Sequence, residues 1–125
     1  MRLLLDAHSL LWWAFDPGRL SGRAREAIEV PTNEVFASAA AIWELFLKAS
    51  HGKLRLPADL ESRIRADGIS LLPIHFSHAR RVSELPWLHR DPFDRMLVAQ
   101  AQVEALTLVT RDDAIRKYDV PTLLA

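Results

Sequence analysis

Leu3-Leu4-Leu5-Asp6 near the start of the chain and Leu106-Thr107-Leu108-Val109-Thr110-Arg111-Asp112 near its end share one pattern. In both, a short apolar run, typical of a buried strand, is followed by an acid. Asp is a preferred helix-capping residue, so each acid is expected where a strand gives way to a helix. Strands joined by helices predict a parallel sheet covered on both faces. Ligands of such sheets bind beyond the carboxyl ends of the strands, where Asp6 and Asp112 are expected.

The remainder of the chain alternates between expected helices and strands in the same way. Pro, Gly and Asn residues mark the turns, and Ser or Asp residues mark the helix starts. The expected helices cover residues 8–15, 23–28, 38–49, 57–68, 78–85, 92–105 and 112–117. The expected strands cover residues 3–5, 35–37, 69–74, 106–110 and 120–124. The sequence therefore predicts an α/β fold.

Composition limits the class of protein. At 125 residues, half of them hydrophobic, the chain is expected to fold as a single domain over residues 1–125. It contains no Cys, which excludes disulfide scaffolds and thiolate metal sites and fits a reducing cytoplasm. Asp6 makes the first apolar run too short for a signal peptide, and no segment approaches the length of a membrane span.

The charge of the chain gives only a weak indication of its partner. The formal net charge is zero, so no overall attraction to nucleic acid is expected. The 16 basic residues comprise 13 Arg and 3 Lys. Because a guanidinium matches the geometry of phosphate oxygens, this bias gives weak support for a phosphodiester substrate.

Four acids are candidates for one shared pocket: Asp6, Glu44, Asp94 and Asp112. Two unit charges about 4 Å apart repel by about 4 kcal/mol at an effective dielectric constant of 20. Clustered carboxylates therefore either take up protons or bind a cation. Carboxylates and water are the usual ligands of Mg²⁺ or Mn²⁺ in phosphate-ester chemistry. Taken singly, Asp6 and Asp112 are better explained as helix caps.

Asp94 is difficult to explain as a cap, because Asp91 already precedes Pro92 at the start of the expected helix. Asp94 shares a helix face with Leu97 and Val98, and that face is expected to be buried. A carboxylate on such a face needs a partner or a cavity.

Glu44 is ambiguous, since an i,i+4 pair with Lys48 explains it as well as a site does. The five histidines lack the spacing of a zinc-binding helix, so a zinc site is not expected.

Four separated motifs resemble those of PIN-domain ribonucleases, and most of all the VapC toxins of bacterial toxin–antitoxin pairs. They are Leu3-Leu4-Leu5-Asp6-Ala7-His8, Ser38 through Glu44-Leu45, His89-Arg90-Asp91-Pro92-Phe93-Asp94-Arg95 and Thr110-Arg111-Asp112. The resemblance covers nearly the whole chain and keeps the family's order. It implies a three-layer α/β/α fold with a central parallel sheet of about five strands. It also implies an acidic site formed by Asp6, Glu44, Asp94 and Asp112.

The function implied by the resemblance is hydrolysis of RNA with Mg²⁺ or Mn²⁺. In this hypothesis Asp6 and Asp94 are direct metal ligands, while Glu44 and Asp112 bind a second ion or orient water. The implied partners are a VapB-like antitoxin and a second copy of the chain, and the implied location is the cytoplasm. A structure-specific DNA nuclease and a non-catalytic regulatory module on the same fold are the alternatives.

Arginines and aromatic residues are further candidates for binding. Arg90, Arg95 and Arg111 lie beside the acids in sequence and are candidates for contacting substrate, although pairing with the carboxylates or solvation explains them equally well. The large aromatic residues are expected first in the core and second in a groove for a partner. These are Trp12, Trp13, Trp43, Phe46 and Trp87.

Overall fold

Five parallel strands form one sheet, in the order β3-β2-β1-β4-β5, in the computed structural model, which describes residues 1–125. The strands are β1 (Arg2–Leu5), β2 (Glu34–Ser38), β3 (Ser70–Leu72), β4 (Thr107–Thr110) and β5 (Thr122–Leu124). The expected parallel sheet of about five strands is confirmed. The chain places β2 and β3 on one side of β1 and then crosses to place β4 and β5 on the other.

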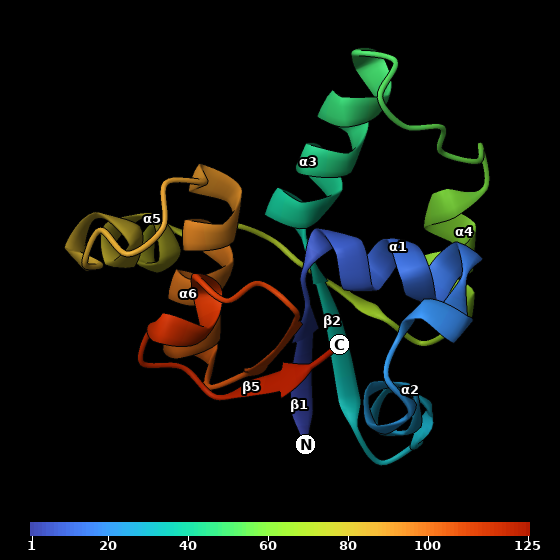
Figure 1. The fold of residues 1–125 in the computed structure, drawn as a ribbon, viewed down its shortest axis with the longest axis horizontal. Coiled ribbons are helices and arrows are strands. Elements are labelled where there is room, and N and C mark those ends of the chain that lie inside the picture. Colours follow the sequence, from blue (N-terminus) through green and yellow to red (C-terminus); the bar gives the residue numbers. More distant parts are fainter.

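Six helices cover the sheet, which gives the expected three-layer α/β/α arrangement. They are α1 (Ala7–Phe15), α2 (Gly22–Glu29), α3 (Ala39–Ser50), α4 (Leu60–Ala66), α5 (Phe76–Glu84) and α6 (Pro92–Glu104). Figure 1 shows α1, α2 and α4 on one side of the strands and α5 and α6 on the other, while α3 extends beyond the end of β2. None of the helices combines the length and hydrophobicity that a transmembrane segment requires.

The central strand β1 is buried on both faces, because Leu3, Leu4 and Leu5 have no exposed surface. Its continuous apolar sequence is what a strand between two helical layers requires. At its carboxyl end the backbone N–H of Asp6 donates to the carbonyl of Val109 in β4, at 3.2 Å. The hydroxyl of Ser9 donates to the same carbonyl at 3.0 Å. These bonds place the start of α1 beside the end of β4, at the point where the strand order reverses.

Several elements differ from the sequence-based expectation; among them, β5 begins at Thr122 and not at residue 120, and α5 covers Phe76–Glu84 and not residues 78–85. The strand expected over residues 69–74 is limited to Ser70–Leu72, since Pro73 has no N–H for the ladder. The helix expected over residues 57–68 begins only at Leu60. The helix expected over residues 112–117 is a 3₁₀ turn, η2 (Ile115–Lys117). A second 3₁₀ turn, η1 (Pro17–Arg19), follows α1.

Arg95 is a buried structural residue, so the prediction that it contacts substrate is wrong. Only 3% of its surface is exposed. Its guanidinium donates to the carbonyls of Pro86 at 2.9 Å and Val82 at 3.0 Å, and to the hydroxyl of Tyr118 at 3.0 Å. It also packs 3.9 Å from the ring centre of Trp87. Arg95 therefore connects α6 to the segment that follows α5, and it pairs with no carboxylate.

We predict that Arg95→Lys lowers the melting temperature measured by circular dichroism. An ammonium cannot reach three separate acceptors, and each hydrogen bond of a charged donor contributes about 1.5–3 kcal/mol. The matched control is Arg90→Lys, because Arg90 is exposed and should tolerate the change. Equal melting temperatures for the two variants would contradict the role given to Arg95.

Candidate metal and active site

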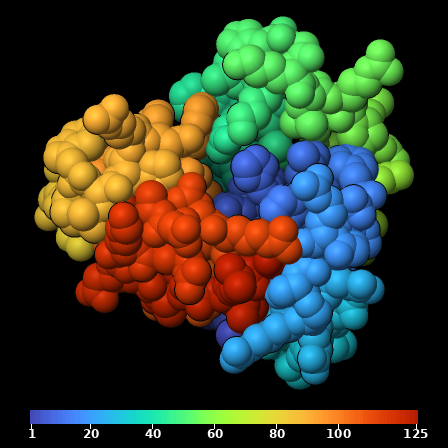
Figure 2. All heavy atoms as spheres, viewed as in Figure 1, coloured from blue at the N-terminus to red at the C-terminus, as the bar shows by residue number.

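The four predicted acids line one pocket of about 360 Å³ beyond the carboxyl ends of β1 and β4. Asp6 follows β1, Glu44 lies in α3, Asp94 lies in the first turn of α6, and Asp112 follows β4. The other lining residues are Ala7, His8, Trp12, Lys48, His89, Asp91 and Arg111. In Figure 2 the dark-blue atoms of the N-terminal segment are recessed between green atoms of α3 and orange-red atoms of the segment after β4.

Asp6 is both a helix cap and a pocket residue. Its Oδ1 accepts the backbone N–H of Ser9 at 2.8 Å, which caps α1. The residue is only 6% exposed, and Oδ2 makes no hydrogen bond within the chain. Capping uses one oxygen and leaves the other for a ligand, so the two explanations from sequence are compatible.

Glu44 carries the clearest sign of a missing partner. It is 7% exposed, and its Oε2 pairs with Nζ of Lys48 at 2.8 Å, as the i,i+4 spacing predicts. Its Oε1 is buried and has no hydrogen-bond partner. Leaving a buried acceptor unsatisfied costs about 1–3 kcal/mol, and more when the group is charged. An oxygen in this position is suited to a cation or to an ordered water.

Asp94 is the acid whose pKa the pocket changes most. Burial, followed by the negative charges of Asp91, Glu44 and Asp6, raises its pKa from 3.8 to about 7, and only His89 acts in the opposite direction. Its Oδ2 lies 3.0 Å from Nε2 of His89, and its Oδ1 has no partner within the chain. Asp91 itself caps α6 by accepting the N–H groups of Phe93 and Asp94. The surplus acid identified from sequence is therefore the one whose charged form is least stable without a cation.

Asp112 is the second acid beside Nε2 of His89, and it is held differently. Its Oδ1 accepts the N–H groups of Ala114 at 2.8 Å and Ile115 at 3.1 Å, and its Oδ2 lies 3.1 Å from Nε2 of His89. Burial acts to raise its pKa, but the bonds from Ile115, His89 and Ala114 outweigh burial and lower it. Asp113 is the exposed neighbour, 3.6 Å from Arg116, so Asp112 is the member of this pair that faces the pocket.

His89 joins two of the acids and was assigned no role from sequence. Its Nδ1 accepts the backbone N–H of Asp91 at 3.2 Å. Nε2 must then carry the proton that is shared with Asp94 and Asp112. The sequence does contain one indication of this role: His89 belongs to the same motif as the acids and lies five residues before Asp94. The spacing of zinc-binding histidines does not reveal it, because that pattern requires at least two histidines.

The donor set fits a hard divalent cation. Three of the four predicted acids have a carboxylate oxygen without a partner within the chain: Oδ2 of Asp6, Oε1 of Glu44 and Oδ1 of Asp94. Asp91, which also lines the pocket, caps α6 through Oδ1 and leaves Oδ2 without a partner. Ligand atoms of His89, Asp94 and Asp112 also lie within 4.8 Å of one another. Oxygen-rich sites of this kind suit Mg²⁺ or Mn²⁺.

Comparison with known proteins gives the family. A family model described as PIN domain matches residues 3–121. The chain belongs to the PIN domain family. The curated protein Ribonuclease VapC22 of Mycobacterium tuberculosis (strain ATCC 25618 / H37Rv) is 32% identical over 122 residues, which cover 95% of this PIN-domain chain and 93% of that protein.

Solved structures agree with this PIN fold. VapBC2 from Rickettsia felis, bound to a DNA fragment from its promoter, contains a chain that aligns with a TM-score of 0.74 at 14% identity, covering 98% of both chains. DNA-bound VapBC from Salmonella typhimurium aligns with a TM-score of 0.71 at 14% identity, covering 98% of this chain and 97% of that one. At these identities the likeness concerns the fold.

The aromatic residues do not all lie where they were expected. Trp43, Phe46 and Trp87 are 61%, 56% and 81% exposed, so the expectation that they belong to the core is wrong. Trp12 and Trp13 are partly buried against the core, and Trp12 also lines the acidic pocket.

We predict that, without divalent ions, Asp94→Asn raises the melting temperature at pH 8 by a few degrees. The pKa of Asp94 is higher in the folded state than when unfolded, so the folded protein binds more protons between pH 4 and 7. Wild-type stability must then fall as the pH rises through this window, and Asn removes that loss. Thermal melts in EDTA at pH 4, 6 and 8 test this, with the exposed Asp113→Asn as control. A stability difference that does not change with pH would refute the pKa assignment.

Proposed function

We propose that this protein is a divalent-cation-dependent endoribonuclease that acts as the toxin of a VapBC-type toxin–antitoxin pair. The observation that carries the proposal is the convergence of Asp6, Glu44, Asp94 and Asp112 on one pocket, with a buried oxygen of Glu44 left without a partner. Membership of the PIN domain family and the similarity to Ribonuclease VapC22 support the reaction class. We treat residues 1–125 as one functional unit.

Within this proposal, Asp6, Glu44 and Asp94, each of which has an oxygen without a partner, would hold Mg²⁺ or Mn²⁺. A cation bound there would neutralise charge on the phosphate and acidify the attacking water. Lys48 restrains Glu44 through its 2.8 Å ion pair, and Ser9 fixes Asp6 through the cap. Asp112, whose Oδ1 accepts two backbone N–H groups, would contribute negative charge and orient water.

His89 acts as a positioning residue in the same proposal. Its single Nε2–H lies within hydrogen-bonding distance of one oxygen each of Asp94 and Asp112. The backbone amide of Asp91 fixes the ring orientation. Contacts of this type around metal ligands keep carboxylates in place, and their loss typically reduces metal affinity or activity 10- to 100-fold.

RNA is the substrate that we favour over DNA. The carboxylates serve either backbone, so the preference rests on the relative named as a ribonuclease. A structure-specific DNA nuclease and a regulatory module remain the outcomes that the assay below distinguishes. We place the protein in the cytoplasm, where its RNA substrates would be.

The partners that we propose are a VapB-like antitoxin and a second copy of the chain. Exposed Trp43 and Phe46 on α3 support an interaction surface, since large apolar side chains on a small protein commonly mark contacts. A groove of about 240 Å³ lies beside Phe46 and is lined mainly by Ile42, Leu60, Ile64 and Leu71. An amphipathic antitoxin segment is the occupant that fits this apolar lining.

We predict that the purified protein cleaves RNA with Mg²⁺ or Mn²⁺ and stops in EDTA. Asp6→Asn and Glu44→Gln should each reduce kcat by at least about 100-fold, because each removes a charged oxygen from the pocket. The assay uses labelled RNA and DNA oligonucleotides, with the exposed Asp113→Asn as control. Cleavage that persists in EDTA would refute the proposed chemistry, and cleavage of DNA alone would favour the DNA nuclease.

We predict that His89→Ala weakens Mn²⁺ binding about 10- to 100-fold, measured from the electron paramagnetic resonance signal of free Mn²⁺. His89→Gln should restore part of this affinity, because its amide N–H replaces Nε2–H. His51→Ala is the control, since His51 is exposed at the end of α3. Tighter Mn²⁺ binding by His89→Ala would mean that the imidazole competes with the ion.

A further inference from the structure

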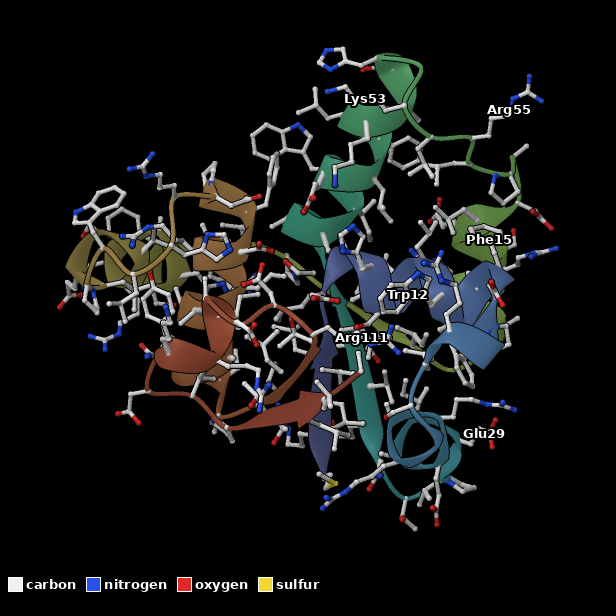
Figure 3. The ribbon with its side chains drawn as sticks, in the orientation of Figure 1. Trp12, Phe15, Glu29, Lys53, Arg55 and Arg111 are labelled. Atoms are coloured by element: carbon white, nitrogen blue, oxygen red, sulfur yellow. The ribbon has the colours of Figure 1, made fainter.

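Two arginines lie on the indole of Trp12, a residue that lines the acidic pocket. The guanidinium carbon of Arg111 is 4.5 Å from the ring centre of Trp12, and that of Arg19 is 5.2 Å from it. Trp12 and Arg111 line the same pocket as the four acids. Figure 3 shows Arg111 next to Trp12 in the centre of the view. Their sequence positions belong to α1, η1 and the segment after β4, so the fold assembles this cationic wall from distant parts of the chain.

Arg111 is held in place before any ligand arrives. Its Nε donates to the main-chain oxygen of Ala125 at 2.5 Å, and its Nη2 donates to the carbonyl of Arg19. Its Nη1 makes no hydrogen bond within the chain. A side chain that is already oriented loses less conformational entropy when it binds, so a pre-positioned guanidinium with a free donor edge is suited to an anion.

Neither guanidinium is neutralised by the acids nearby. No Asp or Glu side chain lies within ion-pair distance of Arg19 or Arg111, although Asp112 adjoins Arg111 in sequence. The oxygens of Asp112 are already engaged by His89 and by the amides of Ala114 and Ile115. The pocket is therefore divided into a carboxylate side and a cationic side. Two like charges on one indole are unfavourable until an anion joins them.

The faces of Trp12 argue against base stacking as the role of this wall. His8 stacks on Trp12 at 5.8 Å with an interplanar angle of 18°. The two guanidiniums also pack against the indole. A nucleobase would have to displace one of these groups, whereas a phosphate can contact the outward donors of the arginines without moving them.

We propose that Arg111 and Arg19, supported by Trp12, form a subsite that binds an RNA backbone phosphate next to the phosphate that is cleaved. The proposal rests on the proposed ribonuclease function and adds the residues that position the substrate. The carboxylate side acts on one phosphate, and the cationic side binds its neighbour. This division allows a chain of zero net charge to bind a polyanion beside its own acidic centre.

RNA binding without cleavage tests the subsite. In an Asp94→Asn background, anisotropy of a fluorescent oligoribonucleotide is measured at several salt concentrations. Arg111→Gln and Arg19→Gln should each weaken binding about 3- to 30-fold and lower the magnitude of the salt slope by about 0.7, the value for one phosphate contact on a single strand. Trp12→Ala should act in the same direction.

The matched control is Arg55→Gln. Arg55 is exposed, makes no ion pair, and points away from the pocket in Figure 3. Its substitution should leave affinity and salt slope at the level of the background. In the active protein, Arg19→Gln and Arg111→Gln should raise KM more than they lower kcat, whereas Asp6→Asn lowers kcat.

The outcomes separate this subsite from the function on which it rests. If the wild-type protein neither binds nor cleaves RNA, the proposed function fails. If it cleaves RNA while Arg19→Gln keeps the parental KM, affinity and salt slope, the subsite is refuted. Arg19→Gln is decisive because the Arg19 side chain makes no hydrogen bond or ion pair, so its loss leaves the polar contacts of the fold intact.

Discussion

Repulsion among carboxylates at the end of the central strands is the constraint on which the site depends. Each acid is restrained by a donor or a cation from its own neighbourhood. Ser9 donates to Asp6, Lys48 pairs with Glu44, and two backbone amides donate to Asp112. Asp94 has only the shared N–H of His89, and its pKa is the one raised to about 7. Neighbouring donors thus stabilise the charged forms of Asp6, Glu44 and Asp112, whereas the charged form of Asp94 needs a bound cation.

Local sequence patterns were sufficient to predict the strands that carry the site and three of its four acids. Apolar runs ending in an acid predicted β1 and β4, and the reversal of strand order placed Asp6 and Asp112 together. Asp94 was identifiable because Asp91 already caps α6. From sequence, Glu44 could be either a site residue or the partner of Lys48, and the structure does contain that ion pair. Only the structure shows that the second oxygen of Glu44 is buried without a partner. Its place in the site was therefore expected from the family resemblance alone.

Residues whose roles depend on distant backbone were beyond the reach of those patterns. Arg95 and Arg111 each lie one residue from an acid in sequence, yet their environments are opposite. The guanidinium of Arg95 points into carbonyls at the end of α5, and the residue is 3% exposed. Arg111 contacts Trp12 and faces the pocket. Periodicity cannot separate the two, because the carbonyl groups that decide the outcome belong to other segments. His89 was missed for the same reason.

The separation of charge within the pocket has a consequence for how substrate and cation cooperate. With its carboxylates ionised and no cation bound, the acidic side would repel RNA, so affinity must come from the side formed by Arg19, Arg111 and Trp12. A cation bound by the carboxylates would make the electrostatic potential on the acidic side positive, so that a second phosphate could approach there. Because the chain carries no net charge, long-range attraction of a polyanion is absent, and binding has to come from local contacts of this kind. Cation and arginine are then complementary: the cation allows the reacting phosphate to enter, and the arginines determine where along the strand it lies.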